Sequence, residues 1–333
     1  MQKRSRPFQV VHGSQGLKVP PPGAVVTIGN FDGVHLGHRH ILQTLAERAR
    51  EVGGSACLLT FDPPPSRVVG RRKAVPQITT LEDRQWLVDD AGVDVMVIEP
   101  FTPELAAWSP ERFVSEILHG RFDPVEVWVG YDFAFGRDRA GDVHFLEAWF
   151  KEHGVTVRQL HAVTGDGGDI ISSTRVRELM TQGDVGAAAA LLGRPHFVRG
   201  PVVQGDRRGR TIGFPTANVA SVTELLPANG VYATWLSVDG VAWPSVTNVG
   251  QRPTFQGEGV RVETHVFDFD SDLYGRDVAV WFHSRLRGEQ RFDGIDALVQ
   301  QIREDAAEAR HRLAPAAIPR LAAASSLPLG ARP

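Results

Sequence analysis

The chain lacks the features of a secreted or membrane protein. Cys57 is the only cysteine among 333 residues, so no disulfide can form within the chain, which is typical of a reducing compartment. No uninterrupted apolar stretch reaches the length of a membrane span. Lys3, Arg4 and Arg6 make the N-terminus basic, but no apolar signal segment follows. We therefore expect a cytoplasmic protein that does not enter a membrane.

Neither sign of charge dominates the chain. Lys and Arg number 36 against 39 for Asp and Glu, which gives a formal net charge of −3. Nothing in this balance indicates nucleic acid as a partner. A hydrophobic content of 42% and a charged content of 23% are typical of a globular protein. The length allows two domains. The sequence leaves open whether the chain is a monomer or a homo-oligomer.

The first part of the chain alternates strand-like runs with helical patterns. This alternation predicts an α/β domain with a mostly parallel sheet over 1–186, with ligands at the carboxyl ends of its strands. The expected strands are Val25–Ile28, Ala56–Phe61, Val93–Ile98, Val125–Val129 and Val155–Leu160, and the expected helices are His38–Arg50, Leu81–Asp90, Pro110–His119 and Val143–Glu152.

After about residue 185 the pattern changes to short β-rich runs separated by turn signals such as Asp239-Gly240. Regular short strands without intervening helices predict a small antiparallel barrel or sandwich over 187–313, ending in a helix from Ile295 to about Leu313. Residues 314–333 are rich in proline and alanine, and we expect this tail to be disordered or loosely attached.

One segment of the first part is the most informative. Val25–His38 reads Val-Val-Thr-Ile-Gly-Asn-Phe-Asp-Gly-Val-His-Leu-Gly-His, a strand, a glycine-containing turn and the start of a helix. Backbone N–H groups and the helix dipole attract phosphate in this geometry. His35 and His38 could donate hydrogen bonds to phosphate oxygens if both rings point the same way. The alternatives are an ordinary polar pair on the helix or a zinc site, for which the chain offers no recognisable ligand set.

Three further segments of this part are candidates. Thr60–Pro65 is a proline-stiffened loop after a strand, either a pocket wall or a plain connection. In Val129–Gly136, glycines flank aromatic residues. This pattern suits either a loop that binds a flat ring or an ordinary loop whose aromatic residues pack into the core. In Ile171–Met180, Ser173 or Thr174 can cap a helix. Arg175 and Arg177 then place positive charge near the positive end of the helix dipole, which is unfavourable unless an anion also binds there.

The second part carries two candidate segments. Gly205–Asn218 is glycine-rich and basic, and Thr216 and Asn218 present oxygen atoms on one side of an extended segment, as Mg²⁺ requires. The alternative is a basic surface loop. Arg261–Asp270 alternates, so that Glu263 lies on one face and could point into the barrel mouth as a proton acceptor. A solvent-facing glutamate is the alternative.

The segments of the first part resemble the nucleotidyltransferase superfamily, and more narrowly the adenylyltransferase module of bacterial FAD synthetases. The resemblance implies a Rossmann-like domain in which the phosphate of FMN attacks the α-phosphorus of ATP. His35 and His38 would contact the α-phosphate, and Ser173, Thr174 and Arg177 the β- and γ-phosphates. Many relatives have a histidine in the proline-rich loop where this chain has Pro64, so that role does not transfer. Further ATP contacts would be Gly29, Asn30, Phe31, Asp32 and Asp132, and flavin contacts Phe61, Asp62 and Phe133.

The second part resembles the riboflavin kinase module, through Gly-Phe-Pro-Thr-Ala-Asn218, Asn248–Phe255, Val-Glu-Thr-His265 and Tyr274-Gly275. By this resemblance Thr216 and Asn218 bind the metal and phosphates, and Glu263 activates the substrate hydroxyl as general base. Gly205, Arg210 and Gly213 would complete the ATP site, and Arg287 and Phe292 would lie near the flavin.

The hypothesis from sequence is a bifunctional enzyme that uses ATP and Mg²⁺ to convert riboflavin to FMN and FMN to FAD. Two alternatives compete with it: a nucleotidyltransferase with another acceptor, such as nicotinamide mononucleotide or a phosphopantetheine, and a non-catalytic flavin-binding or regulatory protein. The kinase-like module argues against the first alternative. The presence of His35, His38, Arg177, Thr216, Asn218 and Glu263 argues against the second.

Overall fold

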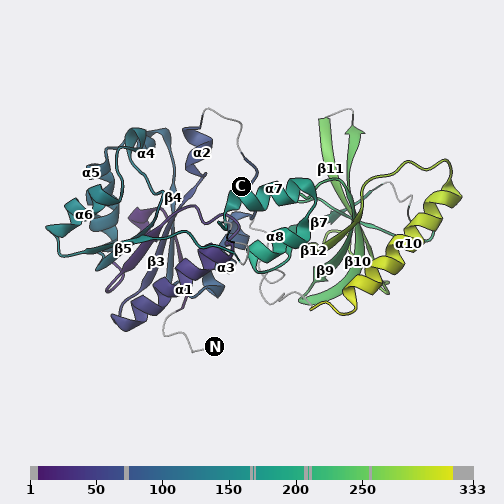
Figure 1. Cartoon of the computed structure of the whole chain (residues 1–333), viewed down its shortest axis with the longest axis horizontal. Helices are drawn as coiled ribbons and strands as arrows, with labels where there is room; N and C mark the ends of the chain where they lie inside the picture. Colours follow the sequence, from purple (N-terminus) through teal and green to yellow (C-terminus); the bar gives the residue numbers. More distant parts are fainter. Residues whose placement is uncertain are drawn as a thin grey trace. The chain divides into compact units, whose positions relative to one another are not determined.

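A computed structural model describes residues 7–70, 75–165, 168, 170–205, 209, 212–254 and 257–317, with the backbone alone for 251–254 and 257–259 (Figure 1). By packing, the chain divides into two units. The first unit comprises Met1–Val75 and Asp83–Ile171, and the second comprises Pro76–Glu82 and Ser172–Pro333. The boundary expected from sequence, between 186 and 187, stays a prediction.

The first unit is built on a six-stranded parallel sheet in the order β1-β4-β3-β2-β5-β6. The five strands expected from sequence are all present within two residues of their predicted starts and ends. The edge strand β1 was not predicted, because its four residues alternate too briefly to stand out. The strands are β1 Gln9–His12, β2 Val25–Ile28, β3 Ala56–Asp62, β4 Val95–Pro100, β5 Glu126–Gly130 and β6 Thr156–Leu160.

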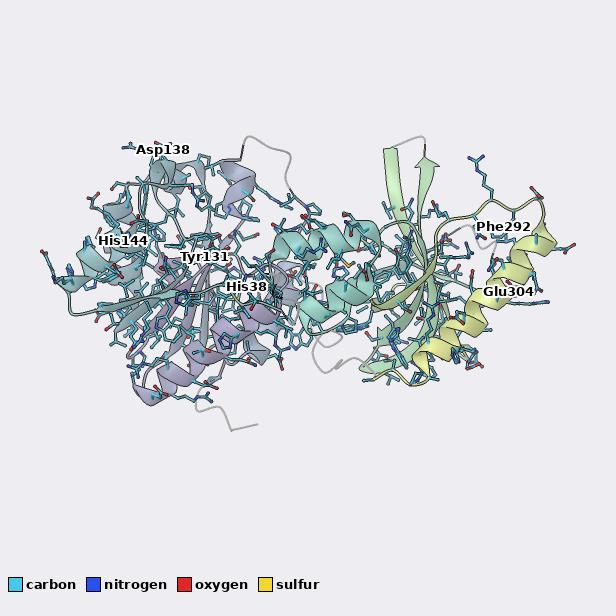
Figure 2. The ribbon with its side chains drawn as sticks, in the orientation of Figure 1. His38, Tyr131, Asp138, His144, Phe292 and Glu304 are labelled. Carbon is cyan, nitrogen blue, oxygen red and sulfur yellow. The ribbon has the colours of Figure 1, made fainter. Side chains whose placement is uncertain are left out.

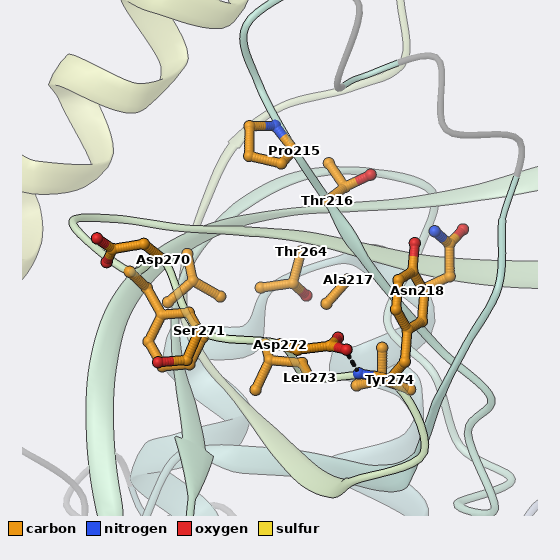
Figure 3. Close-up of a pocket in the computed structure, with 13 residues that line it drawn as sticks. Pro215, Thr216, Ala217, Asn218, Thr264, Asp270, Ser271, Asp272, Leu273 and Tyr274 are labelled. Atoms are coloured by element: carbon orange, nitrogen blue, oxygen red, sulfur yellow. Dashed lines mark hydrogen bonds between the residues drawn. The ribbon is translucent and has the colours of Figure 1, made fainter.

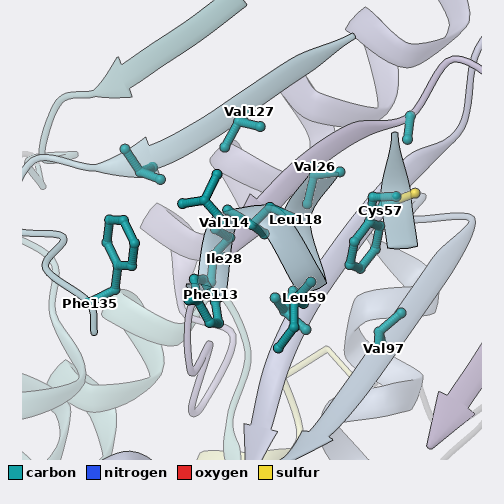
Figure 4. Close-up of a cluster of buried hydrophobic side chains, with 14 of the residues drawn as sticks. Val26, Ile28, Cys57, Leu59, Val97, Phe113, Val114, Leu118, Val127 and Phe135 are labelled. Atoms are coloured by element: carbon teal, nitrogen blue, oxygen red, sulfur yellow. The ribbon is translucent and has the colours of Figure 1, made fainter. Parts of the chain in front are cut away.

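Helices cover the sheet because successive strand residues point to opposite faces. On one face, Val25, Ala56 and Trp128 pack against Leu45 and Ala49 of α1. On the other, the strand residues pack with α5, a π-helix and α6 in the larger apolar cluster (Figure 4). The helices of this unit are α1 Leu36–Glu51, α2 Pro65–Val68, α3 Leu81–Asp90, α4 Pro103–Ala106, α5 Pro110–Phe113, the π-helix Val114–Phe122 and α6 Val143–Lys151. The predicted helix Pro110–His119 is thus α5 continued by the π-helix.

The second unit contains a closed antiparallel barrel in the order β10-β11-β8-β7-β12-β9 (Figure 1). Closure leaves no strand edge unpaired. The strands are β7 His196–Val203, β8 Ala217–Val219, β9 Gly230–Val238, β10 Val241–Thr254, β11 Gly257–Val266 and β12 Asp277–Arg287, and the helices are α7 Ser173–Gln182, α8 Val185–Leu192 and α10 Ile295–Leu313. Parallel sheet, barrel and final helix confirm the predicted fold class.

Residues 76–82 pack with the barrel unit although they lie in the first half of the chain. Ile78 is fully buried in the apolar core of that unit, together with Val176 and Met180 of α7. The backbone of Gln77 donates to Glu224 at 2.9 Å and accepts from Leu225 at 3.1 Å. Sequence patterns along 76–82 gave no sign of this, since the segment has neither strand nor helix periodicity.

Helix α10 is held to the barrel by two arginine–carboxylate pairs. Arg287 of β12 donates from Nε and Nη2 to Asp305, with distances of 2.7–3.1 Å, and both side chains are largely buried. Arg310 donates to both oxygens of Asp268 at 2.7 and 3.0 Å on the surface. Among the described residues, no helix has the length and apolar character needed to cross a bilayer.

Candidate active sites

The turn after β2 places both candidate histidines at the start of α1. Gly29 to Val34 connect the strand to the helix, and His35 is the N-cap residue. Phe31, Gly33 and Val34 have φ values of 47°, 81° and 38°. Left-handed backbone is rare for residues other than glycine and persists only where the surrounding structure holds it. This turn is therefore a constrained segment at the carboxyl edge of the sheet, where α/β proteins bind ligands.

The two imidazoles form a stacked pair. Their ring centroids are 3.6 Å apart with an interplanar angle of 17°, and the backbone N–H of His38 donates to Nδ1 of His35 at 3.2 Å. Because Nδ1 of His35 accepts, its neutral ring carries the proton on Nε2 and can donate from there. Within the described part of the chain, the buried Nδ1 of His38 has no hydrogen-bond partner. Figure 2 labels His38 among its neighbours.

The surroundings of His38 keep its ring uncharged at neutral pH. Burial lowers the pKa of His38 well below its usual value of 6.5, and the neighbouring His35 and Arg84 lower it further. Arg84 lies in α3 and is buried, with Nη2 at 3.8 Å from Oδ1 of Asp32. Sequence analysis missed Arg84. The available signal was its position three and four residues before Leu87 and Val88, on the apolar face of the helix.

Two predicted flavin contacts belong to one aromatic cluster. Phe61 of β3 lies 6.5 Å from Phe113, which lies 5.4 Å from Phe135, and Phe135 stacks on Phe133 at 5.3 Å (centroid distances). Phe61 and Phe133 therefore meet through Phe113, which sequence analysis did not name, and Phe135, an aromatic residue of the Val129–Gly136 segment. Asp62 and Asp132 are exposed near the ends of β3 and β5. Their roles stay predictions.

The predicted phosphate contacts of α7 belong to the second unit. Ser172, not Ser173 or Thr174, caps the helix, because its Oγ accepts from the N–H of Arg175 at 3.2 Å. Arg175 pairs with Glu178 at 3.0 Å, one turn along the helix. This ion pair explains how a positive charge is tolerated near the start of the helix. Arg177 donates from Nε to the backbone oxygen of Pro76 at 2.8 Å. The roles of Ser173, Thr174 and Arg177 toward ATP stay predictions.

The barrel holds a pocket of about 480 Å³ (Figure 3). Thr216 and Asn218, predicted from sequence, lie on its wall. Gly205 packs against Asn218 so closely that an added Cβ would come within 2.3 Å of the amide nitrogen, so a larger residue would displace the Asn218 side chain. On the opposite wall, Phe269 and Asp270 end the alternating segment Arg261–Asp270 and Tyr274 belongs to a kinase motif, whereas Ser271–Leu273 was not predicted. The lining residues are Val202, Pro215, Thr216, Ala217, Asn218, Thr264, Val266, Phe269, Asp270, Ser271, Asp272, Leu273 and Tyr274.

Glu263 stands in the middle of a polar row. It pairs across the sheet with Asn218 of β8 on one side and Asn248 of β10 on the other, and residues directly opposite in antiparallel strands share a face. The sequence leaves open whether Glu263 faces the barrel mouth or solvent, and the burial of Val262, Thr264 and Val266 favours the outer face. Val262 and Val266 occupy the core face, because burying apolar side chains decides which face turns inward. Glu263 is half-buried on the outer face, 3.6 Å from Arg261.

The remaining predicted residues lie elsewhere in the barrel unit. Arg287 is engaged by Asp305, and its guanidinium lies 5.7 Å from the centre of the Phe292 ring. Neither residue lines the pocket. Gly213 occupies a turn with φ of 86°, and Arg210 lies outside the described residues, as do positions 318–333 of the predicted tail. The described residues contain no cluster of three His, Cys, Asp or Glu side chains suited to a metal ion.

A parallel-sheet domain with a constrained turn at the carboxyl edge of its strands, followed by a closed barrel with a pocket, is typical of a two-part nucleotide-using protein. Comparison with family models gives FAD synthetase over residues 18–175 and riboflavin kinase over residues 192–313. A crystal structure described as a macrolide-efflux protein from Streptococcus pneumoniae has the same fold, with a TM-score of 0.82 and 30% identity, covering 90% of this chain and 98% of that one.

Curated relatives named bifunctional riboflavin kinase/FMN adenylyltransferase match nearly the whole chain. The protein from Pseudomonas fluorescens is 40% identical over 93% of this chain and 99% of its own length. The protein from Escherichia coli K12 is 38% identical over 91% and 97%, and that from Bacillus subtilis 35% identical over 91% and 96%. The chain belongs to the family of bifunctional riboflavin kinase/FMN adenylyltransferases.

Proposed function

We propose that the barrel unit transfers the γ-phosphate of ATP to riboflavin, giving FMN and ADP, and that the parallel-sheet unit joins FMN to the adenylyl group of ATP, giving FAD and pyrophosphate. Family membership supports both activities. The observation that carries the assignment to this chain is the presence of two separate candidate sites. These are the stacked histidines at the start of α1 and the Asn218–Glu263–Asn248 row in the barrel.

In the adenylyl transfer, the histidines stabilise charge rather than form a covalent intermediate. The phosphate of FMN attacks the α-phosphorus of ATP, and the bond to pyrophosphate breaks. Negative charge grows on the oxygens around the α-phosphorus during this step. The Nε2–H of His35 and the ring of His38 would donate to these oxygens, and a pair already fixed by stacking loses little freedom in doing so. The left-handed turn and the α1 N-terminus supply backbone N–H donors.

In the phosphoryl transfer, Glu263 would accept the proton of the ribityl 5′-hydroxyl as that oxygen attacks the γ-phosphorus. Its half-buried position leaves the carboxylate accessible to a substrate. The hydroxyl of Thr216 and the amide oxygen of Asn218 are hard oxygen donors on the pocket wall, which fits Mg²⁺ bound together with ATP phosphates. When bound, Mg²⁺ neutralises phosphate charge. Mg²⁺ use and a cytoplasmic location stay predictions.

A chromatographic time course tests the proposal. Purified protein receives ATP and Mg²⁺ with riboflavin in one reaction and with FMN in another. We expect FMN to appear before FAD in the first reaction, and FAD with pyrophosphate in the second. Nicotinamide mononucleotide and phosphopantetheine serve as control acceptors and should give no adenylylated product. Absence of FMN and FAD from both reactions would defeat the proposal, whereas a product from a control acceptor would favour the alternative nucleotidyltransferase.

A further inference from the structure

A buried cation lies beside the histidine pair. Arg84 in α3 is 1% exposed, and its Nη2 atom lies 3.8 Å from Oδ1 of Asp32, which is 7% exposed. Asp32 belongs to the turn between β2 and α1, three residues before His35. Because a guanidinium keeps its proton at any working pH, this positive charge is permanent within the unit.

Fold stability is a weak reason for this charge. Removing a guanidinium from water costs free energy that a carboxylate partner seldom returns in full. Residues 84, 87 and 88 share one helix face, on which Leu87 and Val88 are buried aliphatic side chains. An aliphatic residue at position 84 would suit that face. The chain instead has a cation there, at the turn that carries the histidines.

The paired carboxylate lies within the constrained part of the turn. Phe31 and Val34, on either side of Asp32, have φ values of 47° and 38°. Such conformations persist only when neighbouring structure holds them. The Asp32–Arg84 pair joins this turn to α3, and therefore restrains the segment from which His35 and His38 follow.

We propose that Arg84 is a positioning residue of the adenylyl-transfer site, which anchors the Asp32 turn and places a permanent positive charge beside the phosphate-binding histidines. The inference rests on the adenylyltransferase function proposed above. Arg84 would act through the turn and through its charge. It would not itself contact the reacting atoms.

The charge of Arg84 also acts on His38. Besides burial, His35 at the helix cap and Arg84 of α3 are the groups that lower the pKa of His38 among the described residues, and Asp32 is the carboxylate facing Arg84. Removing the cation makes the imidazolium easier to form, so the pKa of His38 should rise. If the neutral ring is the form that binds ATP, the acid limb of the rate profile moves to higher pH.

The test uses the full chain with Arg84→Gln, Arg84→Lys and the control Arg48→Gln. Arg48 pairs with buried Glu126 at 2.7 Å in the same unit, near the opposite end of α1. The rate of FAD formation from FMN is measured across pH, and His38 is titrated by NMR. FMN formation from riboflavin by the same preparation checks that the barrel unit is folded and active. For Arg84→Gln we expect kcat to fall about 10- to 100-fold, as for a misplaced catalytic group, with the acid limb and the His38 titration moved to higher pH.

The conservative variant separates charge from geometry. Arg84→Lys should keep the acid limb of the wild type, because it keeps the charge, yet lose kcat, because an ammonium cannot reproduce the guanidinium contact. Arg48→Gln should change neither. A wild-type kcat in Arg84→Lys overturns the anchoring role, even if Arg84→Gln does not fold. The proposal is also overturned if Arg84→Gln lowers the rate but leaves the acid limb of the pH–rate profile and the NMR titration of His38 where they are in the wild type. A wild-type enzyme that makes no FAD refutes the proposed function instead.

Discussion

At the scale of single residues, the stacked histidines lead to a prediction about separate activities. His38→Ala should lower FAD formation from FMN by about 10²–10³-fold, because a donor to the developing phosphate charge is lost. FMN formation from riboflavin should be unchanged. The matched control is His144→Ala, an exposed histidine of the same unit that contacts only the side chain of Glu147 among the described residues (Figure 2). Equal loss in both variants would remove the special role of His38.

Sequence reasoning named the residues that carry local motifs. His35, His38, Thr216, Asn218 and Glu263 were candidates because each lies in a short segment with a readable pattern. Arg84 and the pocket residues Ser271, Asp272 and Leu273 were missed, because their importance arises only when the fold brings distant segments together. The orientation of Glu263 stayed open for a related reason: alternation separates two faces of a strand, but only the packed core decides which one is inside.

At the scale of elements, the attachment of α10 depends on the buried Arg287–Asp305 pair. Asp305→Ala should destabilise the second unit by about 3–5 kcal/mol, because it leaves the Arg287 guanidinium partly buried without its carboxylate. Urea unfolding followed by tryptophan fluorescence measures the change. Glu308→Ala on the same helix is the control, since its exposed pair with Arg312 contributes well under 1 kcal/mol. Equal effects of the two substitutions would contradict the role of the buried pair.

The second attachment of α10 should make stability depend on acid. The hydrogen bonds from Arg310 hold the pKa of Asp268 below its usual value of 3.8. A depressed folded-state pKa contributes stability above the unfolded value, and this contribution is lost as pH falls through the lower folded value. As the pH drops below about 4, the urea midpoint of the wild type should therefore fall more than that of Arg310→Ala. Parallel curves for the two proteins would show that the surface pair contributes nothing measurable.

Elements were predicted well where they are long and periodic. The parallel strands and α1 were identified because β-branched runs and apolar spacing are local signals. The short edge strand β1 and the π-helical continuation of α5 were not, since four residues give little periodicity and residue type does not distinguish π from α geometry.

At the scale of the whole molecule, two separate sites predict complementation between variants. Glu263→Gln should make no FMN, and His38→Ala should make little FAD. A mixture of the two proteins should convert riboflavin to FAD, because each variant retains one intact site and FMN can diffuse between them. Each variant alone, at the same total concentration, is the control. Failure of the mixture, with both partial reactions active, would indicate that FMN passes between sites without release.

Because residues 76–82 pack with the barrel unit, they limit where the chain can be truncated to isolate that unit. A fragment starting at residue 187 would lack Ile78, Val176 and Met180, and so would present the hollow they fill to water. A fragment cut at residue 192, where the riboflavin kinase family model begins, would lack the same three side chains and should also be poorly soluble. A fragment starting at residue 172 should recover solubility when a synthetic peptide with the sequence of residues 76–82 is added. This segment would then complete the core of the barrel unit without a covalent link to it.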